Sequence, residues 1–179
     1  MSIQFGPEWE QFNRRLQQFP QNLEANMRVA MEASLLMVER DARRNAPQDT
    51  RRLAGSITSQ IRGTGLALVG QVGPSVRYGA PVEFGAHFPA KGPPPQALVG
   101  WVRRHWGAGL PSRGAARERA LLSRARYLSA LIKRRGLRAR PYLRPAYESN
   151  RAAITAVFAR MGVRVVAQLA GGNQGGTVL

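Results

Sequence analysis

The N-terminal part of the chain carries apolar side chains at three- and four-residue spacing, the pattern of an amphipathic helix. The apolar positions are Trp9, Phe12, Leu16 and Phe19 in a first stripe, and Leu23, Met27, Ala30, Met31, Leu35, Val38 and Ala42 in a second. Pro20 lies between the two stripes, and a proline inside a helix removes a hydrogen bond and clashes with the preceding turn. The pattern therefore predicts a short helix over residues 8–19 and a longer one over residues 21–44.

A helix stop and a helix start follow each other in the segment NAPQDTRRLAGSI, residues 45–57. Pro47 ends the preceding helix, because proline biases its predecessor away from helical dihedral angles. Asp49 or Thr50 can then accept hydrogen bonds from the first amides of a short helix over residues 50–54. Taken by itself, this is also the pattern of a capped loop in an ordinary α+β domain.

Two weakly alternating runs follow, residues 56–62 and 66–73, on either side of Gly63-Thr64-Gly65. Alternation around a glycine-rich turn predicts a β-hairpin. The next run, YGAPVEF at residues 78–84, contains Pro81, which excludes a central strand but fits the first turn of a helix. We expect a short helical turn or an edge segment there.

The C-terminal half predicts three more helices after a stiff, Pro-rich connector over residues 87–95. Apolar stripes predict the first two helices over residues 96–106 and 113–135. The run RPYLRP at residues 140–145 predicts an extended segment, and Pro145 suits the start of the last helix.

These elements predict an α+β fold, in which a small antiparallel sheet packs against a long N-terminal helix and a C-terminal helix, with a helical basic insertion. We expect a single domain over residues 1–170, with the insertion at about residues 95–138. Residues 171–179, rich in glycine, are expected to form a flexible tail.

The formal charge of the 179 residues is +17, and it comes almost entirely from arginine. The segment from Trp101 to Arg151 contains fourteen Lys or Arg residues and two acidic ones. Such an excess indicates a polyanionic or acidic neighbour, since solvated helix faces normally mix both signs. Arg113, Arg117 and Arg124 can share a solvent face of the helix predicted over residues 113–135. The residues expected to face a partner or DNA are Arg103, Arg104, Arg113, Arg117 and Arg124, with Arg119 and Arg126 extending the same surface.

The aromatic residues do not alternate with the basic ones as in base-stacking proteins, which argues against a sequence-specific reader of nucleic acid. Catalytic groups are also sparse: His87 and His105 lie in no metal-ligand spacing, and the chain has no cysteine. Asp49 and Glu83 flank the predicted sheet, where a cap and an arginine partner explain them better than an acid/base pair. The sequence therefore predicts no enzymatic activity, no metal and no cofactor.

The N-terminal residues lack the basic and apolar regions of a secretory signal. No apolar run approaches the roughly 20 residues that a membrane span requires. We therefore expect a soluble protein made in the cytoplasm, with no membrane partner.

Three segments in a fixed order give the chain a resemblance to a known family. They are APQDTRRLAGSI at residues 46–57, RYGAPVEFG at residues 77–85 and RPYLRPAYE at residues 140–148. With a long helix before them, they resemble the gene-product-ten-like tail-component proteins of long-tailed bacteriophages, over roughly residues 22–168. The positions that carry the resemblance are Pro47, Asp49, Thr50, Leu53, Ser56, Ile57, Tyr78, Val82, Glu83, Gly85, Arg140, Pro141, Leu143, Pro145 and Ala146. The chain departs from the family at Arg51, where glycine is usual, and at Ala86, where threonine is common.

The resemblance implies a structural virion protein of the phage neck, which completes the tail end and joins tail to head as an oligomeric ring around the DNA channel. It implies a homo-oligomer, hexameric by analogy, that contacts the tail terminator or tail tube and the head-tail connector, with nonspecific contact to DNA in the channel. The implied location is the neck of the virion, and the host cytoplasm during assembly. A nonspecific DNA-binding protein acting in the cell is the alternative, because the charge of residues 101–151 fits it equally well.

Overall fold

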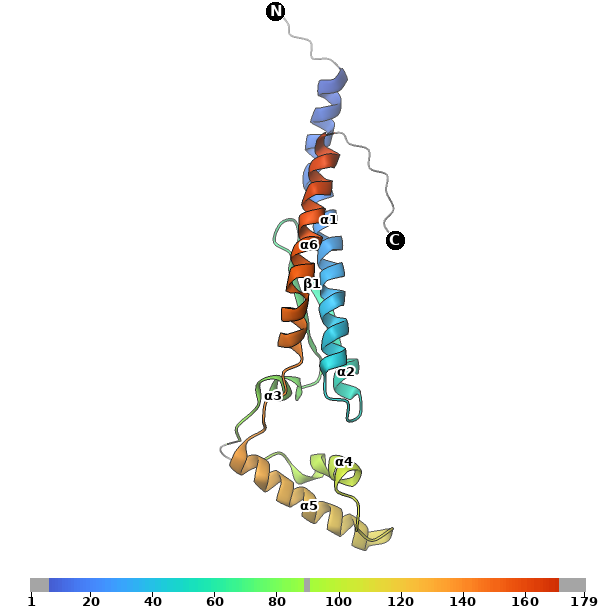
Figure 1. Cartoon of the computed structure of the whole chain (residues 1–179), viewed down its shortest axis with the longest axis vertical. Coiled ribbons are helices and arrows are strands. Elements are labelled where there is room, and N and C mark those ends of the chain that lie inside the picture. The colour runs from blue at the N-terminus through green and yellow to red at the C-terminus, as the bar shows by residue number, and fades with distance from the viewer. Residues whose placement is uncertain (1–6, 89–90, 171–179) are drawn as a thin grey trace, which may run out of the picture. The chain divides into compact units, whose positions relative to one another are not determined.

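The computed structural model describes residues 7–88 and 91–170 (Figure 1). The chain forms two compact units: the first joins the residues up to Arg77 to those from Tyr142 onward, and the second runs from Tyr78 to Pro141. Long helices with one small antiparallel sheet confirm the predicted α+β class. The insertion predicted at about residues 95–138 falls within the second unit, and a single domain over residues 1–170 stays a prediction. The predicted flexible tail, residues 171–179, lies outside the described residues.

Helix α1 runs without a break from Pro7 to Asn45, so the prediction of two helices separated at Pro20 is wrong. Pro20 lies inside the helix, where its ring nitrogen forgoes one helical hydrogen bond. The apolar stripe continues in phase across it, from Leu16 and Phe19 to Leu23. Phe19 and Leu23, on either side of Pro20, both lie beside Leu66, and this packing offsets the local penalty of the proline.

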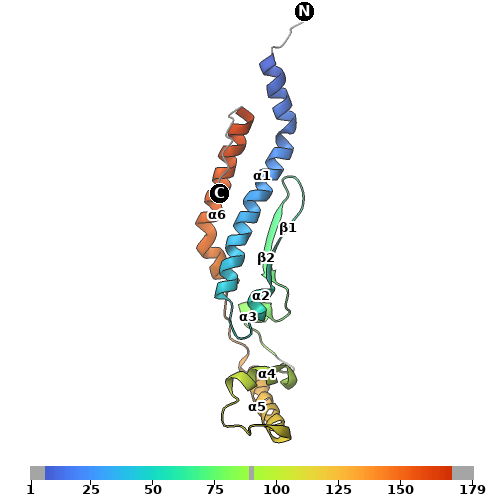
Figure 2. The same cartoon turned by 90° about the vertical axis from the view of Figure 1, so that its right-hand side faces the viewer.

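Helix α6, from Leu143 to Ala170, lies antiparallel beside α1 (Figure 2). The Asn26 amide lies 3.4 Å from the Gln168 side-chain oxygen, which fixes the register near the end of α6. The helix starts two residues before Pro145, earlier than predicted. Proline is tolerated there because the first-turn amides have no helical acceptor.

By length and composition alone, α6 is apolar enough to cross a membrane, with a window of mean hydropathy 1.4. The expectation that no run reaches this length is therefore wrong, because the two arginines of the window, Arg160 and Arg164, are too few to lower its mean hydropathy. Only 6% of the window is buried inside the structure. Helix α6 therefore presents much apolar surface.

The first unit also contains helix α2 from Arg52 to Ser56 and the predicted hairpin, with strand β1 at Ile57–Arg62 and strand β2 at Val69–Pro74. The strands pair antiparallel, with Ile57 opposite Pro74. Gly63 has φ 87°, and a Cβ on it would lie 2.1 Å from the carbonyl oxygen of Ala67, so only glycine fits this turn.

Small side chains dominate the core of this unit. Its buried apolar residues are Ala30, Val38, Ala42, Ala46, Leu53, Ala54, Ile57, Tyr142, Ala146 and Val165. Alanines on facing helices allow the helix axes to approach closely. On the hairpin side, Gly70 allows strand β2 to approach α1 closely, since a Cβ there would lie 2.9 Å from a methyl group of Leu35.

The second unit contains helices α3 (Gly79–Phe84), α4 (Pro95–His105) and α5 (Gly114–Arg135), in agreement with the predicted segments. Helices α4 and α5 pack through Val102, Leu121 and Ala125, which are buried. The Pro-rich connector is tied to α5, because the Ser129 hydroxyl donates to the Pro93 carbonyl oxygen at 2.7 Å.

Helix α2 begins later than predicted. Its N-cap is Arg51, which makes no side-chain capping hydrogen bond, so the expected caps, Asp49 and Thr50, do not occupy that position. Arg51 has φ 56°, in the left-handed region, and it is the one described residue other than glycine with positive φ. This backbone turn moves the start of the helix past Thr50. It also explains why glycine suits this position in the family that the sequence resembles.

We expect Arg51→Gly to stabilise the first unit by about 0.5–1 kcal/mol, because the left-handed conformation costs an L-residue about 1–2 kcal/mol and glycine loses part of this gain through its freer unfolded state. Urea unfolding followed by circular dichroism measures the change. The control is Arg52→Gly, one residue later and inside the helix, which should destabilise by about 1 kcal/mol. A loss of stability in Arg51→Gly would contradict the account of this turn.

Candidate functional site

Arg43 connects the end of α1 to the start of the hairpin. Its guanidinium donates from Nε and Nη2 to the carbonyl oxygen of Ile57, at 3.0 and 2.8 Å. The same group forms an ion pair with Glu39, 2.7 Å from Nη2 to Oε1. Ile57 is fully buried, and Glu39 is nearly so. Arg43 thus holds the first family-like segment against the last turn of the long helix.

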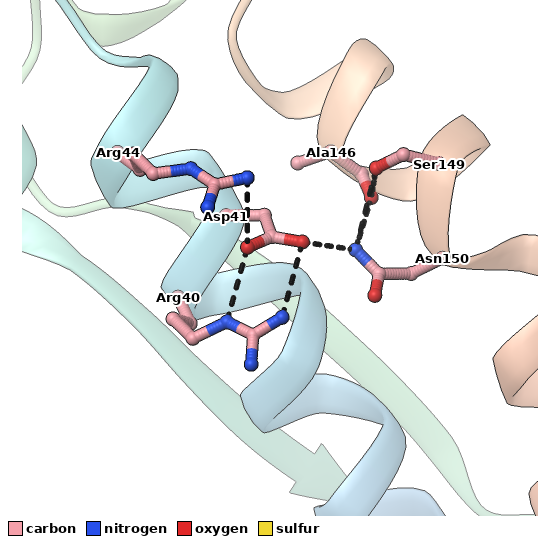
Figure 3. Close-up of polar contacts among 6 residues, drawn as sticks. All are labelled: Arg40, Asp41, Arg44, Ala146, Ser149 and Asn150. Carbon is pink, nitrogen blue, oxygen red and sulfur yellow. Dashed lines mark hydrogen bonds and ion pairs between the residues drawn. The ribbon is translucent and has the colours of Figure 1, made fainter.

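A buried carboxylate joins α1 to α6 (Figure 3). Asp41 is 6% exposed, and its Oδ2 accepts a hydrogen bond of 2.7 Å from the Asn150 side-chain amide. Asn150 is also buried, and its amide donates to the Ala146 carbonyl oxygen at 2.8 Å. We call Asp41 and Asn150 the polar clamp. It lies directly beyond the third family-like segment.

Two arginines of α1 complete the surroundings of the clamp carboxylate. Arg40 donates from Nε to Oδ1 at 3.0 Å and from Nη2 to Oδ2 at 3.4 Å, and Arg44 lies 3.6 Å from Oδ1 (Figure 3). Arg40 lowers the pKa of Asp41 most, by its hydrogen bond, followed by the Asn150 amide, while burial acts in the opposite direction. The carboxylate therefore stays ionised, as suits a structural acceptor and not a proton donor.

The second and third family-like segments meet within the second unit. Gly85 has φ 76°, and a Cβ there would lie 2.8 Å from the Leu137 carbonyl oxygen. Ala86 and Leu137 exchange backbone hydrogen bonds, and the Arg140 amide donates to the Val82 carbonyl oxygen at 2.8 Å. The glycine is thus required by close backbone approach, which gives a physical reason for its place in the motif.

The other predicted site residues divide between the two units. Pro47, Asp49, Thr50, Leu53, Ser56, Leu143, Pro145 and Ala146 lie in the first unit, while Tyr78, Glu83 and Pro141 lie in the second. Leu53, Ala146 and Glu83 are buried, whereas Asp49, Thr50 and Tyr78 are exposed. Among the described residues no group of three His, Asp or Glu side chains could hold a metal ion.

The arginines expected to face a partner have several different surroundings. Arg117 donates to the Pro111 carbonyl oxygen at 2.7 Å, and Arg124 donates to the carbonyl oxygens of Trp106 and Ala108. Both are half-buried, whereas Arg113 is exposed. The reason is the phase of α5: they lie beside its buried stripe, next to the loop that follows α4. Their role in binding a partner stays a prediction.

Arg103 and Arg104 lie in the last turn of α4, and Arg113 is the N-cap of α5. Arg103 forms an exposed ion pair with Glu118, 3.1 Å long. All three arginines are exposed. They remain candidates for contact with an acidic partner.

The outer face of α5 carries a different set of cations. Arg119, Arg126 and Lys133 follow one another at seven-residue spacing, all exposed, on the side of the helix away from Leu121 and Ala125. Two helical turns separate successive cations by about 10.5 Å. We call these three residues the basic stripe.

We expect Asn150→Ala to destabilise the protein by about 1–3 kcal/mol at neutral pH, because the buried Asp41 carboxylate loses a hydrogen-bond donor. The lowered pKa of Asp41 makes this loss pH-dependent: the stabilisation is complete above the ordinary aspartate value of about 3.9 and disappears as pH falls through the lowered value. Urea unfolding at pH 7 and at a series of falling pH values measures both. The control is Arg151→Ala, an exposed neighbour; a loss that stays constant down to the most acidic pH at which the protein folds would contradict the assignment.

Comparisons with curated proteins and with solved structures found no match. A family model described as "Bacteriophage HK97-gp10, putative tail-component" matches residues 10–85, which is less than half of the chain. The match contains most of α1, the hairpin and the first two family-like segments; the third segment lies beyond it. The resemblance that the motifs predict is thereby confirmed: over residues 10–85 the chain is similar to this family of phage tail components.

Proposed function

We propose that this protein is a structural component of the phage neck, which completes the tail end and joins tail to head as a homo-oligomeric ring around the DNA channel. The observation that carries the proposal is the match of residues 10–85 to a family of tail components. That match supports a structural role in the tail, and it favours such a role over an enzymatic one. The position at the neck and the ring are our own extension of it.

Charge supports the position beside DNA. The basic stripe on α5 offers cations about 10.5 Å apart, each exposed. Duplex DNA carries one phosphate charge per about 1.7 Å of its axis, so cations at such spacing find phosphates in any register and at any sequence. A channel that lets DNA pass needs this kind of contact, because base-specific binding would hold the DNA in one place.

The extended helices support assembly with other virion proteins. Val29 and Leu36 on α1 are 61% and 59% exposed, and Val163 and Val166 on α6 are 73% and 66% exposed. Exposed apolar side chains on long helices are available for contacts with other proteins. We propose that these side chains contact neighbouring copies in a closed ring, which is hexameric by analogy. We also propose that they contact the tail terminator or tail tube and the head-tail connector.

A nonspecific DNA-binding protein acting in the cell is the second candidate. The basic stripe favours it as much as it favours a channel protein. The two functions differ in location, since only a neck protein remains in the finished virion.

Purified protein should bind the head-proximal end of tails assembled without it, because a completion protein caps an existing tube. Electron microscopy with a labelled chain measures where it binds. Label along the tube shaft, or DNA binding in lysates with none in purified virions, would contradict the neck assignment and favour the second candidate.

Reversing the stripe to Arg119→Glu, Arg126→Glu and Lys133→Glu should weaken duplex DNA binding without unfolding the protein, because all three side chains are exposed. The slope of log affinity against log salt should fall by roughly 3, at about 0.9 for each phosphate contact. A matched control reverses Arg52, Arg62 and Arg160 to Glu, with the same change in net charge. Equal loss in both triple variants would mean that total charge, and not the stripe, determines DNA binding.

A further inference from the structure

Five cationic side chains lie close together in the sequence where α5 ends, and all of them are exposed. They are Lys133, Arg134, Arg135, Arg138 and Arg140, and we call them the basic turn. No acidic residue occurs in the sequence between Glu118 and Glu148, so no neighbour along the chain neutralises them. Within residues 7–88 and 91–170, none of these five side chains takes part in an ion pair or a hydrogen bond. Their charge is therefore available to a ligand.

The backbone of the basic turn is held by contacts within the second unit. Gly136, at φ 75°, ends α5, and a Cβ on it would lie 2.9 Å from the Ala86 carbonyl oxygen. Leu137 and Ala86 exchange backbone hydrogen bonds of 2.7 and 3.0 Å. The Arg140 amide donates to the Val82 carbonyl oxygen at 2.8 Å. These contacts fix the backbone before a ligand binds, so less conformational entropy is lost on binding.

The dipole of α5 explains only part of this charge. Lys133, Arg134 and Arg135 lie in the last turn of the helix, where cations interact favourably with its free carbonyl groups. Arg138 and Arg140 lie outside the helix, so the dipole gives no reason for them. Surfaces that serve solubility alone usually mix both signs of charge. Five exposed cations without an acidic residue among them therefore indicate an anionic ligand.

The side chains of the basic turn fit a phosphate chain better than a protein surface. Protein interfaces depend on a core of aromatic and large apolar side chains. Between residues 133 and 140 the sequence has one large apolar side chain, Leu137, which is only 36% exposed. Duplex DNA presents one charge per about 1.7 Å of its axis, so several phosphates can meet the turn at once. The segment also has no aromatic side chain, and single strands are usually held by stacking on aromatic rings.

We propose that the basic turn binds the phosphate backbone of duplex DNA, as a site additional to the basic stripe. Lys133 belongs to both sets, so the two groups of cations are continuous at the end of α5. Guanidinium groups donate paired N–H bonds to phosphate oxygens, and such contacts carry no sequence information. That this DNA is the DNA of the channel rests on the proposed function, whereas the binding itself does not.

The salt dependence of DNA binding tests the site. The turn variant combines Arg134→Gln, Arg135→Gln and Arg138→Gln, and it should remain folded because all three side chains are exposed. For a duplex of random sequence, the slope of log affinity against log salt should fall by about 2.7, at about 0.9 for each lost phosphate contact. The matched control combines Arg52→Gln, Arg62→Gln and Arg160→Gln, which removes the same charge from exposed positions of the first unit. An unchanged slope in the turn variant, or an equal fall in both variants, would overturn the proposal.

Binding of poly-L-glutamate tests an acidic protein as the partner instead. Charges in an extended polypeptide lie about 3.3–3.6 Å apart, roughly twice their spacing along duplex DNA. We therefore expect the turn variant to lose more affinity for DNA than for poly-L-glutamate. A larger loss for poly-L-glutamate would overturn the proposal and indicate an acidic protein.

The site and the proposed function can fail separately. If the turn variant shows the reduced slope but electron microscopy finds the chain outside the neck, the DNA site stands and the neck assignment is wrong. If the chain lies at the neck but the turn variant binds DNA as the unaltered protein does, the neck assignment stands and the DNA site is wrong.

Discussion

The packing of α6 along α1 is the constraint on which the first unit depends. It joins two segments separated by the whole second unit, and alanines at the interface allow the helices to approach closely. The buried polar clamp favours one register, in which Asn26 lies level with Gln168 at the other end. A shift of α6 by one turn would take the Asn150 amide away from the buried Asp41 carboxylate and leave it with Arg40 and Arg44 alone, so the shifted register loses a buried hydrogen bond. The register also decides how much of α1 remains uncovered.

Several positions in or beside the family-like segments make close backbone contacts or adopt a backbone conformation that few side chains allow. Arg43 holds the carbonyl oxygen of Ile57 at the entry to the hairpin, and Gly85 passes close to the backbone near Leu137. Arg51 adopts the left-handed conformation that glycine adopts without strain. These positions support the motif as a structural joint, which agrees with the similarity to tail components over residues 10–85.

Much of the fold follows from periodicity in the sequence. The hairpin and the helices of the second unit were predictable because their apolar spacing and glycine turns are local signals. The continuity of α1 through Pro20 was not predictable from the sequence. The sequence shows the penalty of a proline inside a helix, but it does not show the packing that offsets this penalty. Asp41 and Asn150 lie 109 residues apart, and only the fold brings them together. A polar residue in phase with an apolar stripe, as Asp41 is between Val38 and Ala42, was the available signal. The roles of Arg117 and Arg124 likewise depend on how α5 is rotated toward the loop after α4.

Under the proposed function, the pair of α1 and α6 supplies exposed apolar side chains for assembly, and the basic helix α5 contacts DNA. The central claim is that copies of this chain form a ring at the junction of tail and head. Electron microscopy of the virion neck tests it most directly. The account predicts a closed ring of this chain at the tail end, with the outer face of α5 toward the DNA. A neck in which this chain has no density, or density confined to the tail shaft, would contradict it.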